Sequence, residues 1–179
     1  MARRKLMFWV FSLVGVVVAL IAIVVIVGFS LPKEHTASRT LKLDQKPEAV
    51  WNVITDFKNQ PSWLPLVTSA EKQADHDGHP VWQEVYKNSN DKITLETTES
   101  VPPQKLVRTI PDTGGPFFGR WEYEITPTKN GCAVKITEYG TVPNPVFRFM
   151  SKFVFGHNAT VESYLKALAA KFGQAPDIS

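Results

Sequence analysis

The feature that most constrains the fold of this chain is an uncharged apolar stretch near its N-terminus. Residues Leu6–Leu31 contain no charged side chain, and valine and isoleucine dominate from Val14 to Val27. At a rise of ~1.5 Å per residue, a helix of this length spans the roughly 30 Å hydrocarbon core of a bilayer. A buried core helix rarely runs this far without a charge. The stretch therefore predicts a transmembrane helix over residues 6–31.

A cleaved signal peptide is the main alternative to an anchor. The apolar part of a signal peptide usually has about 7–15 residues and ends at a cleavage site with small residues. This stretch is longer, and the sequence Leu31-Pro32-Lys33-Glu34 offers no such site. We therefore expect an uncleaved anchor. The basic cluster at residues 3–5 predicts a cytoplasmic N-terminus by the positive-inside rule, with the rest of the chain periplasmic or extracellular.

The net charge argues against a nucleic-acid partner. The isoelectric point is near 9.0, but Arg3, Arg4 and Lys5 supply three of the 20 basic residues, so the rest of the chain carries 17 basic against 17 acidic residues. The basicity therefore belongs to the N-terminus, and no basic face is predicted on the soluble part. The single cysteine, Cys132, excludes an intramolecular disulfide and indicates an ordinary strand residue.

Beyond the anchor, alternating apolar and polar residues predict an antiparallel sheet of about six to seven strands. Asp77-Gly78 and Asn130-Gly131 are hairpin signals between such segments. The expected strands are Ala37–Leu43, Val67–Gln73, Val81–Lys87, Lys92–Ser100, Lys105–Ile110, Arg120–Thr126 and Cys132–Tyr139.

Helical spacing of apolar residues predicts two further elements. A short helix begins at Pro47 and ends near Phe57, and a single turn follows at Ser62–Leu64. Asn144-Pro145 is a typical N-cap and first helical residue, and apolar residues then recur every three or four positions as far as Phe172. This second pattern predicts a helix of nearly thirty residues, in which Gly156 marks either a kink or a break with Asn158 capping a second segment.

The predicted order gives an α+β fold with a defined domain plan. Residues 1–31 form the basic N-terminus and anchor, and residues 32–36 form a linker. Residues 37–173 form one domain, and residues 174–179 form a tail. A curved sheet around the long C-terminal helix buries the apolar faces of both.

Three segments resemble a known superfamily. They are Pro47–Phe57 (PEAVWNVITDF), Pro61–Pro65 (PSWLP) and the terminal helix Asn158–Phe172. They are similar to the START-like (SRPBCC, Bet v 1-like) superfamily, in particular to its polyketide cyclase/dehydrase-like branch, over about Ala37–Gly173. The resemblance implies a helix-grip fold with a deep cavity between sheet and helix. Such proteins bind lipids, sterols, polyketides or other apolar molecules, and a few are enzymes. The resemblance carries over no catalytic residue.

Aromatic side chains are the first candidates to line such a cavity. Their large apolar surfaces and few polar groups suit an apolar ligand, but the same residues could be ordinary core. They are Trp63, Trp82, Trp121, Tyr123, Phe147 and Phe153.

Three polar residues are further candidates because each shares a face with apolar residues. Glu138 follows Val134 and Ile136 on one strand face. It could act as an acid or base, pair with an arginine such as Arg108 or Arg148, or lie near the solvent at the strand end. Arg108 could bind a carboxylate or phosphate, form a buried ion pair, or be a surface residue whose charged end reaches the solvent. His157 could orient a ligand or be a core histidine.

No cofactor or metal is predicted. His76 and His79 stand in a turn between Asp75 and Asp77 with no further ligand set, so we interpret them as solvated turn residues. Three functions remain open. The first is a membrane-anchored binding or carrier module for a hydrophobic small molecule or lipid. The second is a cyclase/dehydratase-type enzyme that acts in the same cavity, and the third is an extracytoplasmic protein–protein interaction module.

Overall fold

The computed structural model describes residues 2–87, 92–156 and 158–179. They form two compact units. One comprises residues 1–33 and 142–156, and the other comprises residues 34–141 and 157–179.

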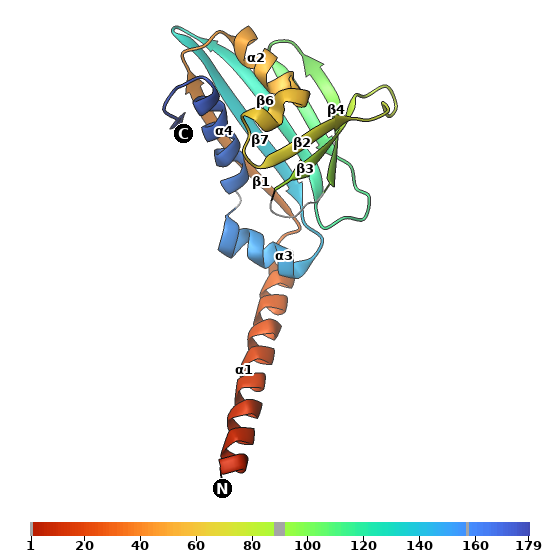
Figure 1. The fold of residues 1–179 in the computed structure, drawn as a ribbon, viewed down its shortest axis with the longest axis vertical. Helices are drawn as coiled ribbons and strands as arrows, with labels where there is room; N and C mark the ends of the chain where they lie inside the picture. The colour runs from red at the N-terminus through yellow and green to blue at the C-terminus, as the bar shows by residue number, and fades with distance from the viewer. Residues whose placement is uncertain (1, 88–91, 157) are drawn as a thin grey trace. The chain divides into compact units, whose positions relative to one another are not determined.

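The larger unit is an eight-stranded antiparallel sheet with three helical segments (Figure 1). The strand order is β2-β3-β4-β5-β6-β7-β1-β8, so the first strand lies beside the seventh. The count is one more than the sequence predicts, because β8 in the expected C-terminal tail pairs with β1. The elements are β1 (Glu34–Leu43), α2 (Pro47–Thr55), η1 (Phe57–Ser62), β2 (Val67–Lys72), β3 (Val81–Tyr86), β4 (Lys92–Val101), β5 (Lys105–Ile110), β6 (Phe118–Thr128), β7 (Gly131–Thr141), α4 (Ala159–Lys171) and β8 (Asp177–Ile178).

The turn residues set the strand register as the sequence predicts. The two-residue turn Lys129-Asn130 joins β6 to β7, and Thr128 pairs directly with Gly131, the first residue of β7. A side chain at Gly131 would collide with the backbone of Leu43, because a Cβ there lies 2.1 Å from the Leu43 carbonyl oxygen. Glycine is therefore required at this turn for close packing against the end of β1.

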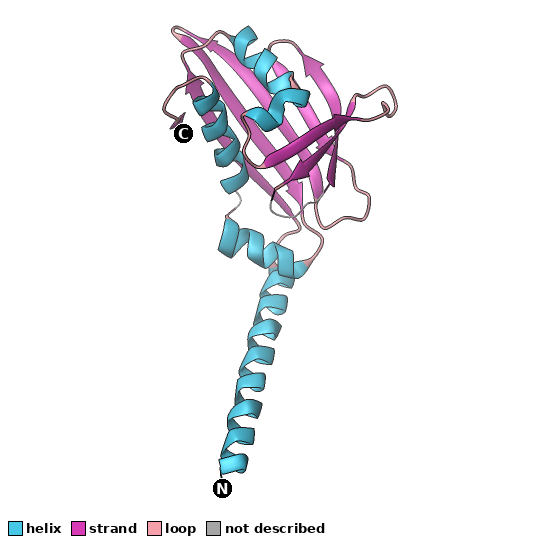
Figure 2. Ribbon diagram, viewed as in Figure 1, coloured by secondary structure: helices cyan, strands magenta, loops and turns pink. Residues whose placement is uncertain are grey.

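One face of the sheet is covered by α2, η1 and α4 (Figure 2). Pro47 opens α2, and the helix buries Val50, Trp51 and Ile54. The sequence predicts that this helix continues to Phe57. In the structure the α-helix ends at Thr55, and a 3₁₀ helix follows over Phe57–Ser62. Pro61 lacks the N–H that a continuing α-helix needs, which agrees with a short, tight turn at this point.

The predicted C-terminal helix is not continuous. It divides into α3 (Pro145–Met150), the π-helical turn η2 (Ser151–Phe155) and α4, with Gly156 at a φ of 77° between them. The sequence left a kink or a break open at Gly156, and the structure shows the break. Asn158 occupies the N-cap position of α4, but its side chain makes no capping hydrogen bond.

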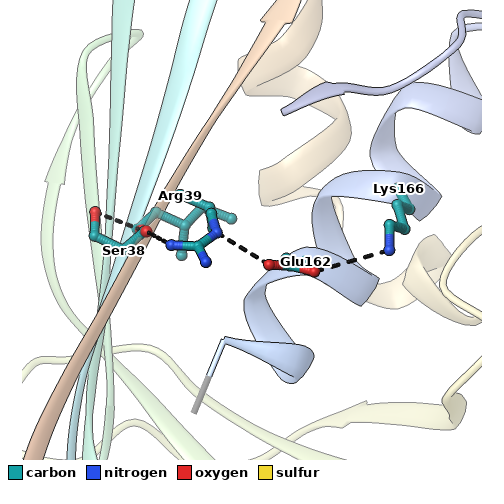
Figure 3. A network of polar contacts seen from close by, with 5 residues as sticks. Ser38, Arg39, Glu162 and Lys166 are labelled. Atoms are coloured by element: carbon teal, nitrogen blue, oxygen red, sulfur yellow. Dashed lines mark hydrogen bonds and ion pairs between the residues drawn. The ribbon is translucent and has the colours of Figure 1, made fainter. Parts of the chain in front are cut away.

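An ion pair fixes α4 to the sheet (Figure 3). Arg39 of β1 donates from Nε to Glu162 of α4 at 3.0 Å and from Nη1 to the Ser38 carbonyl at 2.9 Å. Lys166 lies 3.9 Å from the other Glu162 oxygen. The core beneath is apolar: Val161, Leu165 and the residues around them are fully buried.

The smaller unit contains α1 (Ala2–Ser30), α3 and η2. Within α1, the stretch Trp9–Ser30 contains 18 consecutive residues with a mean hydropathy of 3.3, and it is long and apolar enough to cross a membrane. Asn144 caps α3 as predicted, because its side-chain oxygen accepts from the backbone N–H groups of Val146 and Phe147.

Candidate functional site

A buried ion pair lies on the helix-covered face of the sheet. Glu84 comes from β3 and Arg108 from β5, with β4 between these strands. Arg108 donates from Nη1 to Glu84 Oε1, and both side chains are 2% exposed. The guanidinium carbon also lies 4.0 Å from the centre of the Phe57 ring in η1. The sequence left a ligand contact or a buried ion pair open for Arg108, and the structure shows the ion pair.

Tyr86 completes the contacts of the glutamate. It shares the inner face of β3 with Glu84, and its hydroxyl donates to Glu84 Oε2 at 3.0 Å. Burial and the neighbouring Glu84 carboxylate raise the pKa of Tyr86 well above its ordinary value. The phenol therefore stays protonated and remains a hydrogen-bond donor at neutral pH.

Several polar atoms around this pair are buried without a hydrogen-bond partner among the described residues. They include Nε and Nη2 of Arg108, Oγ1 of Thr97 and Oε1 of Gln60. Thr97 lies directly opposite Arg108 in the β4–β5 register, and Gln60 belongs to η1. Leaving a buried group of this kind unsatisfied costs about 1–3 kcal/mol, so native proteins rarely keep several together without a functional reason.

An aromatic group adjoins the polar one. The Tyr164 ring of α4 lies 5.4 Å from Trp63, 5.8 Å from Trp121 and 5.6 Å from Tyr123, between ring centres. The structure thus brings three of the predicted cavity residues together. Trp82 lies apart from them and packs against the Phe57 ring at 5.6 Å.

Besides the indole nitrogens, the polar atoms of these four rings are the hydroxyl oxygens of the two buried tyrosines, Tyr123 and Tyr164. Burial is the main cause that raises the pKa of Tyr123 and of Tyr164. The Tyr164 hydroxyl lies near Gln60 and Tyr123 but makes no hydrogen bond of normal geometry. It is therefore a protonated phenol, able to donate to or accept from a bound molecule.

Glu138 lies on the same inner face as Arg108, as its spacing predicts. Trp121 of β6 stands between them, opposite Arg108 on one side and opposite Glu138 on the other. Two strand spacings of about 4.8 Å separate the two backbones by roughly 10 Å. The partner of Glu138 is neither expected arginine, because its Oε1 lies 3.2 Å from Nε2 of His35, and its Oε2 is buried without a hydrogen bond.

The remaining sequence candidates do not join this group. Phe147 and Phe153 belong to the smaller unit and are 52% and 57% exposed. His157 lies outside the described residues. His76 contacts Glu96 at 3.0 Å, and within the described ranges no three His, Cys, Asp or Glu side chains are grouped to hold a metal.

The sequence analysis named neither Glu84 and its partner Tyr86 nor Tyr164, Gln60 and Thr97 as site residues. Glu84 alternates with Trp82 and Tyr86 on one face of β3, so a charge between two inward aromatic residues was the available signal. Tyr164 follows Val161 by one helical turn on the apolar stripe of α4, which also places its ring inward. Thr97 shares one face of β4 with Ile93 and Leu95, so alternation was the available signal for it. Gln60 gave no such signal, since its inward direction depends on η1.

The fold and this inner face define the class of the protein. It is a START-like α+β protein whose sheet and helices make a fold for binding hydrophobic molecules. A family model described as polyketide cyclase/dehydrase and lipid transport matches residues 34–173, and the chain belongs to this family. No curated protein matches the sequence.

Solved structures confirm the fold. A START superfamily protein from Mycobacterium smegmatis is 16% identical, with a TM-score of 0.60 over 76% of this chain and 96% of that chain. The Zhui aromatase/cyclase from Streptomyces sp. R1128 is 12% identical, with a TM-score of 0.61 over 77% of this chain and 93% of that chain. A protein from Thermobifida fusca is 23% identical, with a TM-score of 0.57 over 77% and 93%.

Proposed function

We propose that this protein is a membrane-anchored binding or carrier module that holds one hydrophobic small molecule or lipid against the inner face of its sheet. The observation that carries the proposal is the set of buried polar atoms without partners around Arg108 and Thr97. A bound molecule that offers an oxygen atom there removes their desolvation cost. The family supports an apolar molecule, and the polar atoms indicate that it also has a polar end.

The chemistry of these atoms favours a neutral acceptor on the ligand. Arg108 can only donate, and the hydroxyls of Thr97 and Tyr164 can also donate. The charge of Arg108 is already balanced by Glu84. A ligand carboxylate would therefore leave a net buried negative charge, which is costly in a low-dielectric site. A carbonyl or ester oxygen accepts the same hydrogen bonds without that cost.

The apolar part of the ligand has a matching surface beside the polar one. The rings of Trp63, Trp121, Tyr123 and Tyr164 form one edge-to-face cluster on the inner face. Aromatic side chains with a small number of placed polar groups are typical of small-molecule sites. The proposed ligand is therefore amphipathic, with a carbonyl-type group at Arg108 and an apolar body along these rings.

The anchor places this binding function at a membrane. The α1 stretch Trp9–Ser30 supports a single membrane crossing, and the basic residues 3–5 support a cytoplasmic N-terminus. We infer that the START-like unit works on the outer side, within reach of lipids and other bilayer-soluble molecules. An alkaline phosphatase fusion at residue 179 tests on which side of the membrane the domain lies. An active fusion supports the outer side, and an inactive fusion contradicts it.

Native mass spectrometry of the full chain, released from detergent micelles, tests the ligand class. The protein is incubated with methyl palmitate, palmitic acid and hexadecane in equal amounts, and bound masses are compared. We expect the ester to be retained over the acid and the acid over the hydrocarbon. Equal retention of all three, or of none, contradicts the proposal.

A matched pair of variants makes this test specific. Thr97→Val removes an inward hydroxyl at constant shape and should weaken ester retention by about two- to tenfold. Thr126→Val makes the same change at an exposed position of β6 and should leave retention unchanged. If both variants behave alike, the polar atoms around Arg108 do not bind the ligand.

A second candidate is a cyclase/dehydratase-type enzyme, and the arrangement of Glu138 favours it. Its unpartnered Oε2 shares the inner face with Arg108, and His35 holds its other oxygen. A carboxylate there could take the α-proton of a β-hydroxy ketone whose carbonyl accepts from Arg108. As the C=C bond forms, the carboxyl group returns this proton to the departing β-hydroxyl, which leaves as water. Loss of the mass of water from such a probe supports the enzyme if Glu138→Gln abolishes it and the control Glu124→Gln does not. A probe that binds but keeps its mass supports the carrier.

A further inference from the structure

The segment Pro145–Phe155, formed by α3 and η2, leaves large apolar side chains uncovered. The exposed fractions are 40% for Val146, 52% for Phe147 and 57% for both Phe153 and Val154. Burying such a side chain is worth about 1.5–3 kcal/mol, and water-soluble surfaces rarely keep several together. The segment has no acidic residue, and it carries the exposed base Lys152.

Specific contacts hold α3 at the C-terminal end of α1. Gly28 approaches so closely that a Cβ there would lie 2.0 Å from the Pro145 carbonyl oxygen. Arg148 is buried, and its Nη1 donates to the Leu31 carbonyl at 2.7 Å while Nη2 donates to the Pro143 carbonyl at 3.2 Å. The last carbonyls of a helix need such partners, and a basic side chain also complements the negative end of the helix dipole.

These contacts set the depth of the segment if α1 crosses a membrane. The span ends at Ser30, and Phe29 and Ile26 just before it are 67% and 69% exposed. Because Pro145 packs against Gly28, the apolar residues of α3 continue this exposed surface at the end of the span. An apolar, aromatic and basic segment at that level has the composition of an interfacial helix.

We propose that Pro145–Phe155 lies in the headgroup region of the leaflet at which α1 ends and binds anionic phospholipid. In this arrangement Phe147, Phe153 and Val154 insert beneath the headgroups, and Lys152 extends to the phosphates. The proposal rests on the proposed membrane anchoring. It also explains why this part of the predicted C-terminal helix is separated from α4 at Gly156.

Site-directed fluorescence on the full chain in vesicles tests the proposal. The single native thiol, Cys132, is fully buried, and burial raises its pKa, so it does not compete for a thiol-reactive dye. Phe153→Cys carries the dye on the segment, and Lys135→Cys carries it at an exposed position of β7 as the control. Vesicles of phosphatidylglycerol and phosphatidylcholine contain a nitroxide lipid whose quencher lies either near the headgroup or deep in the chains.

We expect the dye at residue 153 to be blue-shifted and quenched by the shallow nitroxide, and the dye at residue 135 to show neither effect. Lys152→Glu should reduce the quenching at residue 153 in anionic vesicles, whereas Lys171→Glu in α4 should not. An unquenched dye at residue 153 overturns the inference.

A third label separates this inference from the anchor. Val16→Cys places the dye in the middle of the span, where the deep nitroxide should quench it. If the Val16 label is quenched and the Phe153 label is not, α1 spans the membrane and the segment does not bind it. If the Val16 label is not quenched either, the anchor is overturned and this inference with it.

Discussion

The two halves of the helix-covered sheet face are built from different chemistry. On β1 and β7, Leu41, Val134 and Ile136 are fully buried beneath Leu165 and Leu168 of α4. On β3, β4 and β5, the equally buried positions hold charged and polar side chains, namely Glu84, Thr97 and Arg108. Neither half is uniform, since Leu106 of β5 and Glu138 of β7 also lie on this face. The fully buried ion pair of Glu84 and Arg108, however, lies on the second half, which we call the polar half, and the first is the apolar half.

The difference between the two halves concerns stability, because burial of apolar and of polar side chains contributes differently to the free energy of unfolding. The apolar side chains beneath α4, such as Leu41, Val134 and Ile136, gain free energy from their burial. The polar half carries a buried ion pair, whose desolvation offsets most of its attraction, and unpartnered atoms that cost more. An apolar replacement there would stabilise the fold as well or better, which is why we assign the polar half to the proposed ligand.

The largest effect is expected from removing one member of the ion pair. Arg108→Met leaves Glu84 buried and uncompensated, and should lower the free energy of unfolding by about 3–5 kcal/mol. Urea denaturation followed by circular dichroism measures the loss. The double variant Glu84→Leu with Arg108→Met removes both charges and should regain most of the stability. If the double variant is no more stable than the single one, the two halves do not differ as described.

A core substitution in the apolar half sets the scale for this comparison. Leu168→Ala should cost about 2–5 kcal/mol, because the lost burial and the space left behind add together. Lys166→Ala on the exposed side of the same helix should change stability by no more than about 0.5 kcal/mol. The same denaturation curves report both values. A small effect of Leu168→Ala would show that α4 is not an essential part of the core.

A smaller effect on stability is expected from removing the Tyr86 hydroxyl, which donates to Glu84. Tyr86→Phe removes the 3.0 Å hydrogen bond to Glu84 Oε2, and should cost about 1.5–3 kcal/mol because the acceptor is charged and buried. Tyr139→Phe on the opposite face of the sheet is the matched control, with an expected change within about 0.5 kcal/mol. Thermal unfolding distinguishes them, and equal midpoints would contradict the role of Tyr86.

The polar half should also make the domain sensitive to high pH. The raised pKa values of Tyr86, Tyr123 and Tyr164 keep these phenols protonated in the folded state. Their stabilisation is complete below the unfolded pKa near 10 and is lost as the pH rises above it, because only the unfolded chain releases the protons. The loss approaches about 1.4 kcal/mol per pH unit for each tyrosine. Unfolding curves between neutral pH and pH 11 measure it, and Tyr164→Phe should flatten the slope.

The sequence predicted the fold well because the relevant signals are local. Hairpin turns such as Asn130-Gly131, the opening Pro47 of α2 and the N-cap Asn144 of α3 each depend on a few neighbouring residues. Alternation put Trp121, Tyr123 and Glu138 among the candidates by the face they share, although it does not say which face of the sheet points inward. The break at Gly156 was one of two alternatives, since spacing alone cannot tell a kinked helix from a divided one.

The polar site was predicted only in part because it depends on contacts between distant segments. Arg108 was recognised, but its partner Glu84 lies two strands away, and no pattern within β5 indicates which residue that is. Gln60 becomes a site residue only because η1 crosses the inner face. The partner of Glu138 was missed for the same reason, because the β1–β7 pairing alone brings His35 beside it.

The position of β1 in the sheet also has a consequence for synthesis. In its pairing with β7, the residues nearest in sequence are Leu43 and Cys132, and Glu34 pairs with Thr141. The first strand of the domain therefore has no neighbour until nearly the whole chain has been made. Contacts this far apart in sequence slow folding, since a long loop must close before they form. Until then both edges of β1 present unpaired backbone N–H and C=O groups, so the chain is exposed to pairing with other strands while it is being made.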